Sequence, residues 1–106
     1  PLALLDQENA PTAYFTQHLA ITSDLLKQLN QTDLKIGENI SLIGFEDLPM
    51  VEFFKTPITV IKEDPYKIGT EAAKSLLTLI QDKTAPAKKL VLPCTLTIRE
   101  SCHKVV

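Results

Sequence analysis

The sequence has few glycines, one arginine and no long apolar run, and each of these absences excludes a class of protein. Three glycines in 106 residues provide no Gly-rich loop for phosphates, and neither a GxSxG nor an HExxH motif is present. No apolar run approaches the roughly 18 residues of a transmembrane helix. Residues 1–6 also lack the basic start and cleavage site of a signal peptide. With Arg99 as its one arginine and a net charge of −2, the chain has no basic patch for direct DNA binding.

Cysteine is also scarce. Cys94 and Cys102 lie eight positions apart and form no CxxC motif. Without an export signal we expect reduced thiols in a cytoplasmic protein, and a disulfide is the alternative for a secreted domain. His18 and His103 would complete a set of four metal ligands, but the spacing matches no zinc pattern, so we predict neither a metal nor a cofactor. The chain begins at Pro1 without Met, which suggests a piece of a longer protein.

What the sequence does contain is an alternation of helical and extended patterns. The composition, 44% apolar and 23% charged, is typical of a globular domain. The clearest helix begins at Asp64 and Pro65, which suit the N-cap and first helical position, and apolar residues recur at helical spacing up to residue 81. A second helix is expected over 19–31. The expected strands are 13–16, 40–45, 58–61, 90–92 and 94–98. This order predicts an α/β fold with an open, mostly parallel sheet flanked by helices.

Polar side chains follow two of the predicted strands. His18 comes after strand 13–16, and Glu46 and Asp47 come after strand 40–45. Ligands of open parallel sheets bind at the carboxyl ends of the strands, where a carboxylate accepts hydrogen bonds from paired hydroxyls, as in a sugar. The alternative is that Glu46 and Asp47 are solvated loop residues and that His18 only begins a helix. Adjacent carboxylates usually diverge, which argues against an acid/base pair.

Residues 40–47 (ISLIGFED) resemble the (I/V)SLIGFDD signature of the LacI/GalR family of bacterial transcription regulators. Four other segments are similar to family segments in the family's order: 11–15 (PTAYF), 56–61 (TPITVI), 64–69 (DPYKIG) and 90–101 (LVLPCTLTIRES). The resemblance covers essentially the whole chain, and the combination of segments is specific.

The resemblance implies a type I periplasmic-binding-protein-like fold. The chain would hold the C-terminal lobe, about 1–62 and 94–106, while about 63–93 would cross into the N-terminal lobe. Family members are cytoplasmic homodimers that bind operator DNA through a helix-turn-helix, which this chain lacks. A small-molecule effector, often a sugar or sugar phosphate, binds between the lobes and shifts the affinity for the operator. A sugar-binding protein of a transport system shares this fold and is the nearest alternative; a small hydrolase using Glu46 and His18 is a weaker one.

The resemblance also suggests site residues. The family's first acid after GF faces the effector, and here it is Glu46; the family's polar pair after the first strand falls on His18 and Leu19, of which Leu19 cannot replace the acid. We therefore expect Glu46, His18, Asp47 and Glu63 to bind the effector and no residue to be catalytic. The family's dimer surface falls on the helix 19–31 and on segment 48–54. For the apolar residues of the second segment, ordinary packing within the lobe is the alternative. The expected dimer residues are Ser23, Lys27, Met50, Val51, Phe53 and Phe54.

Overall fold

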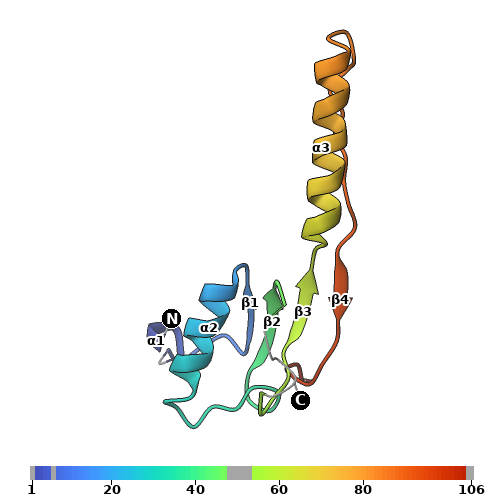
Figure 1. The fold of residues 1–106 in the computed structure, drawn as a ribbon. Helices are drawn as coiled ribbons and strands as arrows, with labels where there is room; N and C mark the ends of the chain where they lie inside the picture. The colour runs from blue at the N-terminus through green and yellow to red at the C-terminus, as the bar shows by residue number, and fades with distance from the viewer. Residues whose placement is uncertain (1, 6, 48–53, 105–106) are drawn as a thin grey trace. The chain divides into compact units, whose positions relative to one another are not determined.

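The computed structural model describes residues 2–5, 7–47 and 54–104 of the chain (Figure 1). Its elements follow the order α1 (Leu2–Leu5), β1 (Ala13–Thr16), α2 (Leu19–Leu29), β2 (Ser41–Phe45), β3 (Thr59–Lys62), α3 (Pro65–Gln81) and β4 (Thr95–Thr97). The alternation of helices with strands confirms the predicted α/β class.

The strands form one four-stranded sheet in the order β1-β2-β3-β4. β1 pairs with β2 in parallel, with Ala13 opposite Ser41, and β2 pairs with β3 in parallel, with Ile43 opposite Thr59. β4 runs against β3, as the arrows in Figure 1 show. The sheet is therefore open and mostly parallel, as predicted, and the carboxyl ends of β1, β2 and β3 meet at one edge.

The core lies between α2 and one face of the sheet. α2 contributes Leu25 and Leu29, which are four positions apart and so share a helix face. The strands and their flanking residues contribute four more buried side chains, Ile40, Leu42, Ile58 and Val60. In β2 burial alternates, with Leu42 and Gly44 buried and their neighbours half-buried, because successive residues of a strand face opposite sides.

The segment after β4 is hydrogen-bonded to both central strands. Ser101 is fully buried. The backbone N–H of Thr59 donates to the Ser101 hydroxyl at 2.8 Å, and that hydroxyl donates to the carbonyl of Leu42. The backbone N–H of Leu42 in turn donates to the carbonyl of Ser101 at 2.9 Å. These bonds fix the residues just before Ser101, including Arg99, against the start of β3.

The chain divides into two compact units, Pro1–Lys62 with Leu96–Val106 and Glu63–Thr95. In the second unit α3 begins as predicted: the Asp64 carboxylate accepts from the backbone N–H of Lys67 at 3.0 Å, and Pro65 occupies the first turn. No described residue of α3 is buried, and Leu76, Leu77 and Ile80 are all exposed.

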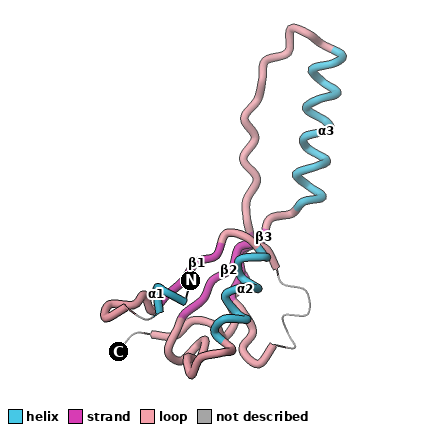
Figure 2. Tube along the Cα trace, turned by 90° about the vertical axis from the view of Figure 1, so that its left-hand side faces the viewer, coloured by secondary structure: helices cyan, strands magenta, loops and turns pink. Residues whose placement is uncertain are grey.

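The strand predicted at 90–92 is absent, and this prediction is wrong. The chain after α3 runs back beside the helix as a loop (Figure 2). A strand needs a hydrogen-bonded neighbour, and within the described ranges residues 90–92 have none. The apolar pattern alone does not supply that neighbour.

Cys94 and Cys102 are both exposed and are not joined to each other by a disulfide. In the portion of the chain that the structure describes, no helix combines the length and the apolar character needed to cross a membrane.

Candidate functional site

Glu46 lies where β2 ends, against the first turn of α2. Its backbone N–H donates to the carbonyl of Ile61 at 2.8 Å, and its φ of 73° is in the left-handed region, which non-glycine residues seldom adopt. This backbone turn directs the half-buried side chain to α2, where Oε2 accepts from the backbone N–H of Leu19 at 3.3 Å. The carboxylate thus lies at the positive end of the helix.

His18 is the N-cap of α2. Its backbone is extended, with φ −147° and ψ 143°, and its Nδ1 accepts from the backbone N–H of Ala20 at 3.1 Å. Since Nδ1 accepts this bond, a neutral imidazole carries its hydrogen on Nε2, which is then a donor. The structure therefore brings Glu46 and His18 together at one helix terminus. His18 begins that helix, as the alternative interpretation expects, and a ligand contact by either residue stays a prediction.

Two threonines fix this end of α2 to the sheet. The hydroxyls of Thr16, in β1, and Thr22, in α2, are 2.7 Å apart and buried. The Thr22 hydroxyl also donates to the carbonyl of His18 at 3.1 Å. This pair was not predicted from the sequence. The relevant signal is a hydroxyl residue at the end of a strand and another one turn into the next helix.

The arrangement suits a neutral hydroxyl. Glu46 offers a carboxylate acceptor and His18 an N–H donor, and a sugar hydroxyl both donates and accepts. A phosphate would need free backbone N–H groups at the helix terminus, but those of Leu19 and Ala20 are already hydrogen-bonded to Glu46 and His18. The negative carboxylate would also repel a phosphate.

Asp47 points into an ion cluster that we call the Asp47 cluster, formed by Asp47, Arg99 and Lys62. Arg99 donates from Nη1 and Nη2 to the two carboxylate oxygens at 3.2 and 3.4 Å, and Lys62 Nζ lies 3.6 Å from Oδ2. Burial raises the pKa of the Asp47 carboxyl, but the Arg99 guanidinium and the Lys62 ammonium lower it by more, so that the pKa lies below the usual 3.8. A ligand contact by Asp47 stays a prediction.

Arg99 also belongs to this site and was not predicted from the sequence as part of it. Its guanidinium also donates to the carbonyl of Ile58 at 2.8 Å. It lies 52 positions from Asp47 along the chain, so no local pattern joins the two. The one available signal is that Arg99 is the chain's single arginine and lies within the family-like closing segment.

Glu63 is exposed and belongs to the unit Glu63–Thr95. Its predicted contact with an effector stays a prediction.

The predicted dimer residues fall into two groups. In α2, Ser23 is half-buried and Lys27 is exposed. Phe54 is half-buried and packs against the core cluster, as the alternative interpretation for that residue expects. Met50, Val51 and Phe53 lie outside the described residues, so the interface stays a prediction.

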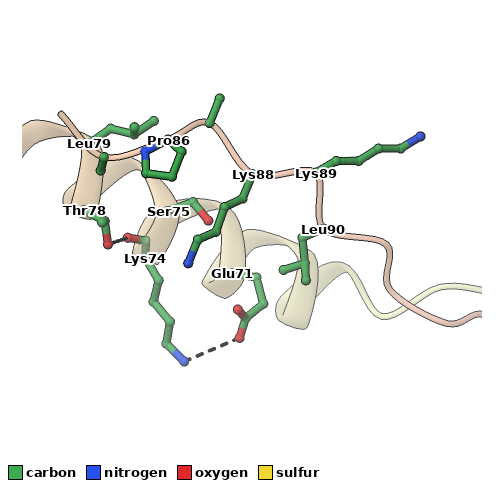
Figure 3. Close-up of a pocket in the computed structure, with 11 residues that line it drawn as sticks. Glu71, Lys74, Ser75, Thr78, Leu79, Pro86, Lys88, Lys89 and Leu90 are labelled. Carbon is green, nitrogen blue, oxygen red and sulfur yellow. Dashed lines mark hydrogen bonds and ion pairs between the residues drawn. The ribbon is translucent and has the colours of Figure 1, made fainter. Parts of the chain in front are cut away.

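A separate hollow of about 640 Å³ lies within the unit Glu63–Thr95, between α3 and residues 85–90 (Figure 3). Its lining includes Leu79, Leu90 and Lys88, and Lys74 Nζ pairs with Glu71 Oε1 at 3.5 Å. None of the predicted effector residues lines it. Over the ranges that the structure describes, no three His, Cys, Asp or Glu side chains are grouped to hold a metal ion.

The family model of the periplasmic binding protein-like domain matches residues 2–102. The HTH-type transcriptional repressor CytR of Escherichia coli K12 is 34% identical over 98 residues, which are 92% of this chain and 29% of the repressor. PurR of Vibrio vulnificus, another HTH-type transcriptional repressor, is 30% identical over the same shares.

A solved structure of a LacI family regulator is also similar to this chain. The LacI family transcriptional regulator of Enterococcus faecalis V583, which has bound ribose, superposes with a TM-score of 0.81 at 28% identity, covering 94% of this chain and 37% of the regulator. These relatives are transcriptional regulators rather than enzymes. The chain spans less than a third of the length of the two repressors. It belongs to the periplasmic binding protein-like domain family, in the form found in the effector-binding part of LacI-type transcriptional regulators.

Proposed function

We propose that this chain is part of the effector-binding and dimerisation domain of a longer, cytoplasmic LacI-type regulator. The observation that carries the proposal is the meeting of Glu46 and His18 at the first turn of α2. The ribose in the Enterococcus faecalis regulator supports a sugar or related polyol as the effector.

The proposed effector presents neutral hydroxyls to the α2 terminus. One Glu46 oxygen is bound to Leu19, and the carboxylate accepts a ligand hydroxyl through the other. His18 donates to the same ligand from Nε2. A sugar phosphate would have to direct its phosphate away from this terminus, because Glu46 repels it and the first N–H groups are in use.

The proposed domain has two lobes. Residues of about 1–62 and 94–106 form one lobe, and about 63–93 cross into the other. The division into units after Lys62 and after Thr95 supports this, and so does α3, whose apolar side chains have no cover among the described residues. Glu63 follows the first crossing, and we propose it as a further effector contact on the family resemblance alone.

The proposed mechanism is a shift between two lobe arrangements. An effector that binds one arrangement better than the other increases its population, and a homodimer transmits the change to operator DNA through a helix-turn-helix outside these residues. No catalytic step is involved, so an effector leaves the protein unchanged.

The test begins with a thermal-shift screen of the full-length protein against free pentoses, hexoses and their phosphates, followed by calorimetric titration of the strongest ligand. We expect a free sugar to bind and Glu46→Gln to weaken it at least tenfold, since a hydrogen bond to a charged group is lost (about 1.5–3 kcal/mol). Glu38→Gln is the matched control, because Glu38 is an exposed carboxylate paired with Lys35.

Two results would contradict the proposal. One is equal affinity in wild type and Glu46→Gln. The other is turnover of the ligand that is lost in Glu46→Gln, which would favour a hydrolase.

A further inference from the structure

We infer that Arg99, acting through Asp47, is a positioning residue for the Glu46 carboxylate. The inference rests on the proposed function, in which Glu46 binds the effector. It assigns Asp47 to the support of its neighbour instead of to the ligand itself.

Glu46 has a backbone conformation that needs support. A φ of 73° is uncommon for a residue with a Cβ, because the Cβ approaches the following carbonyl oxygen. The conformation nevertheless places Oε2 3.3 Å from the backbone N–H of Leu19. An extended backbone at the same position would direct the side chain elsewhere, so the ligand-binding geometry depends on what holds this turn.

The chain is held on both sides of Glu46. On the amino side, the backbone N–H of Glu46 itself donates to the carbonyl of Ile61 in β3 at 2.8 Å. On the carboxyl side, the Asp47 carboxylate accepts from both terminal nitrogens of Arg99 at 3.2 and 3.4 Å. Such a two-pronged bond fixes the orientation of a carboxylate as well as its position.

Arg99 is itself rigidly placed, as a positioning residue must be. Its Nη1 donates to the carbonyl of Ile58 at 2.8 Å and its backbone N–H donates to the Thr59 hydroxyl at 2.9 Å. Its side chain is only 20% exposed. The Lys62 side chain is 50% exposed, and among the described residues its one ion pair is 3.6 Å long, so it adds charge without fixing orientation.

Both oxygens of Asp47 are occupied by Arg99, and one also faces Lys62. Three of the roughly four acceptor sites of this carboxylate are thus directed to Arg99 and Lys62, so most of its hydrogen-bonding capacity is used within the cluster. The geometry is therefore that of a support adjacent to a binding residue.

The test is a double-mutant cycle in the full-length protein, read by titration with the free pentoses and hexoses, D-ribose included. Arg99→Met in the wild-type background is expected to raise Kd by about tenfold, a loss of about 1.4 kcal/mol. In a Glu46→Gln background the same change is expected to raise Kd less than twofold, because the positioned group is already altered. Arg99→Lys keeps the charge but not the two-pronged bond, and its Kd is expected to be close to that of Arg99→Met.

Lys35→Met is the matched control, since it removes an exposed cation of the same unit that pairs only with Glu38 among the described residues. Its Kd should equal that of wild type. An equal loss from Arg99→Met in both backgrounds, or no loss in either, would overturn the inference. If Arg99→Met does not fold, Asp47→Asn replaces it in the same cycle with the same expectations.

A readout without ligand separates this inference from the proposed function. In a ligand-free crystal structure of Arg99→Lys, we expect Glu46 to leave the left-handed region and to lose its contact with Leu19. Retention of both would overturn the inference even if no sugar binds the wild type. Absence of sugar binding together with a displaced Glu46 would overturn the proposed function alone.

Discussion

At the scale of single residues, two glycines have opposite roles. Gly37 has φ 84°, and a Cβ there would lie 2.5 Å from the carbonyl oxygen of Glu100. Gly69 lies inside α3, and apart from its chain neighbours and the backbone of its own helix a Cβ there would meet no atom of the described residues within 4 Å. The first position requires glycine for conformation and space, whereas the second has the entropic cost of glycine in a helix.

We predict that Gly37→Ala lowers the free energy of unfolding by about 2 kcal/mol or more, from left-handed strain and the clash with Glu100. Gly69→Ala is its matched control and should be much less destabilising, because Gly69 has no left-handed backbone and no close contact to the described residues outside its helix. Urea unfolding of the full-length protein measures both. Equal effects of the same sign would contradict this account of Gly37.

The Asp47 cluster makes the free energy of unfolding depend on pH in a direction that can be predicted. The native pKa of Asp47 lies below 3.8, so the unfolded chain takes up this proton at a higher pH than the native chain does. The stabilisation by Asp47 is therefore fully present above about pH 5 and is lost as the pH falls through 3.8 to the lower native pKa.

We predict that the stability difference between wild type and Asp47→Asn is constant from pH 7 to about pH 5 and shrinks below that. Urea unfolding at a series of pH values measures the difference, and subtraction of the two proteins removes the contributions of all other carboxyls. A difference that stays constant down to pH 3 would show that the native pKa of Asp47 is not lowered.

Local sequence patterns predict contacts between residues that are near in sequence or that follow the carboxyl ends of neighbouring parallel strands. Glu46 and His18 were identified because parallel strands bring their carboxyl ends together, and the structure does bring them together. Ser101 and Arg99 were not assigned a role, because their partners are about 40 to 60 positions away. Such contacts depend on the register of the whole sheet, which no local period encodes.

At the scale of elements, the start of a helix can be predicted from single capping residues, whereas a strand depends on a hydrogen-bonded neighbouring strand. Asp64 and Pro65 predicted the start of α3 to the residue. The helix predicted over 19–31 ends at Leu29, because Asn30 caps it and the Thr32 hydroxyl bonds to the carbonyl of Leu29. The predicted strand 90–92 has no partner in the described ranges, so its apolar run stays a loop.

His18 caps α2 and, in the proposed function, also donates to the effector from Nε2. Two substitutions separate these roles. His18→Ser keeps a side-chain acceptor for the cap, so the free energy of unfolding should change by no more than about 0.5 kcal/mol. Sugar affinity should fall, because the serine hydroxyl does not reach as far as Nε2. His18→Ala should lower both, with a loss of about 1 kcal/mol in stability. Unfolding and titration of the two variants measure this; unchanged sugar affinity in both would limit His18 to capping.

At the scale of the whole molecule, the 106 residues contain two units, and the second exposes apolar side chains along its one helix. The chain spans 29% of CytR. The sequence resemblance predicted the family and the fold, both of which are confirmed. The dimer interface and the arrangement of lobes depend on other chain segments and stay proposals.

The proposed dimer surface is tested on α2, where Ser23 and Lys27 are one turn apart and share a face. We predict that Lys27→Glu shifts the full-length protein toward monomer, because a two-fold interface places the reversed charge in both copies. Lys35→Glu is the control, as Lys35 lies outside α2. Sedimentation equilibrium measures the change, and a dimer of unchanged dissociation constant would remove α2 from the interface.

In the proposed function, a sugar-like effector bound at Glu46 controls the binding of DNA by the full-length protein. The most direct measurement is the affinity of the full-length protein for a DNA site selected from random sequences, read by fluorescence anisotropy with and without the sugar found in the screen. We predict a change of at least about fivefold in Kd for wild type and none for Glu46→Gln. A full-length protein that binds the sugar but whose DNA affinity is the same with and without it, or that binds no DNA, would contradict the account.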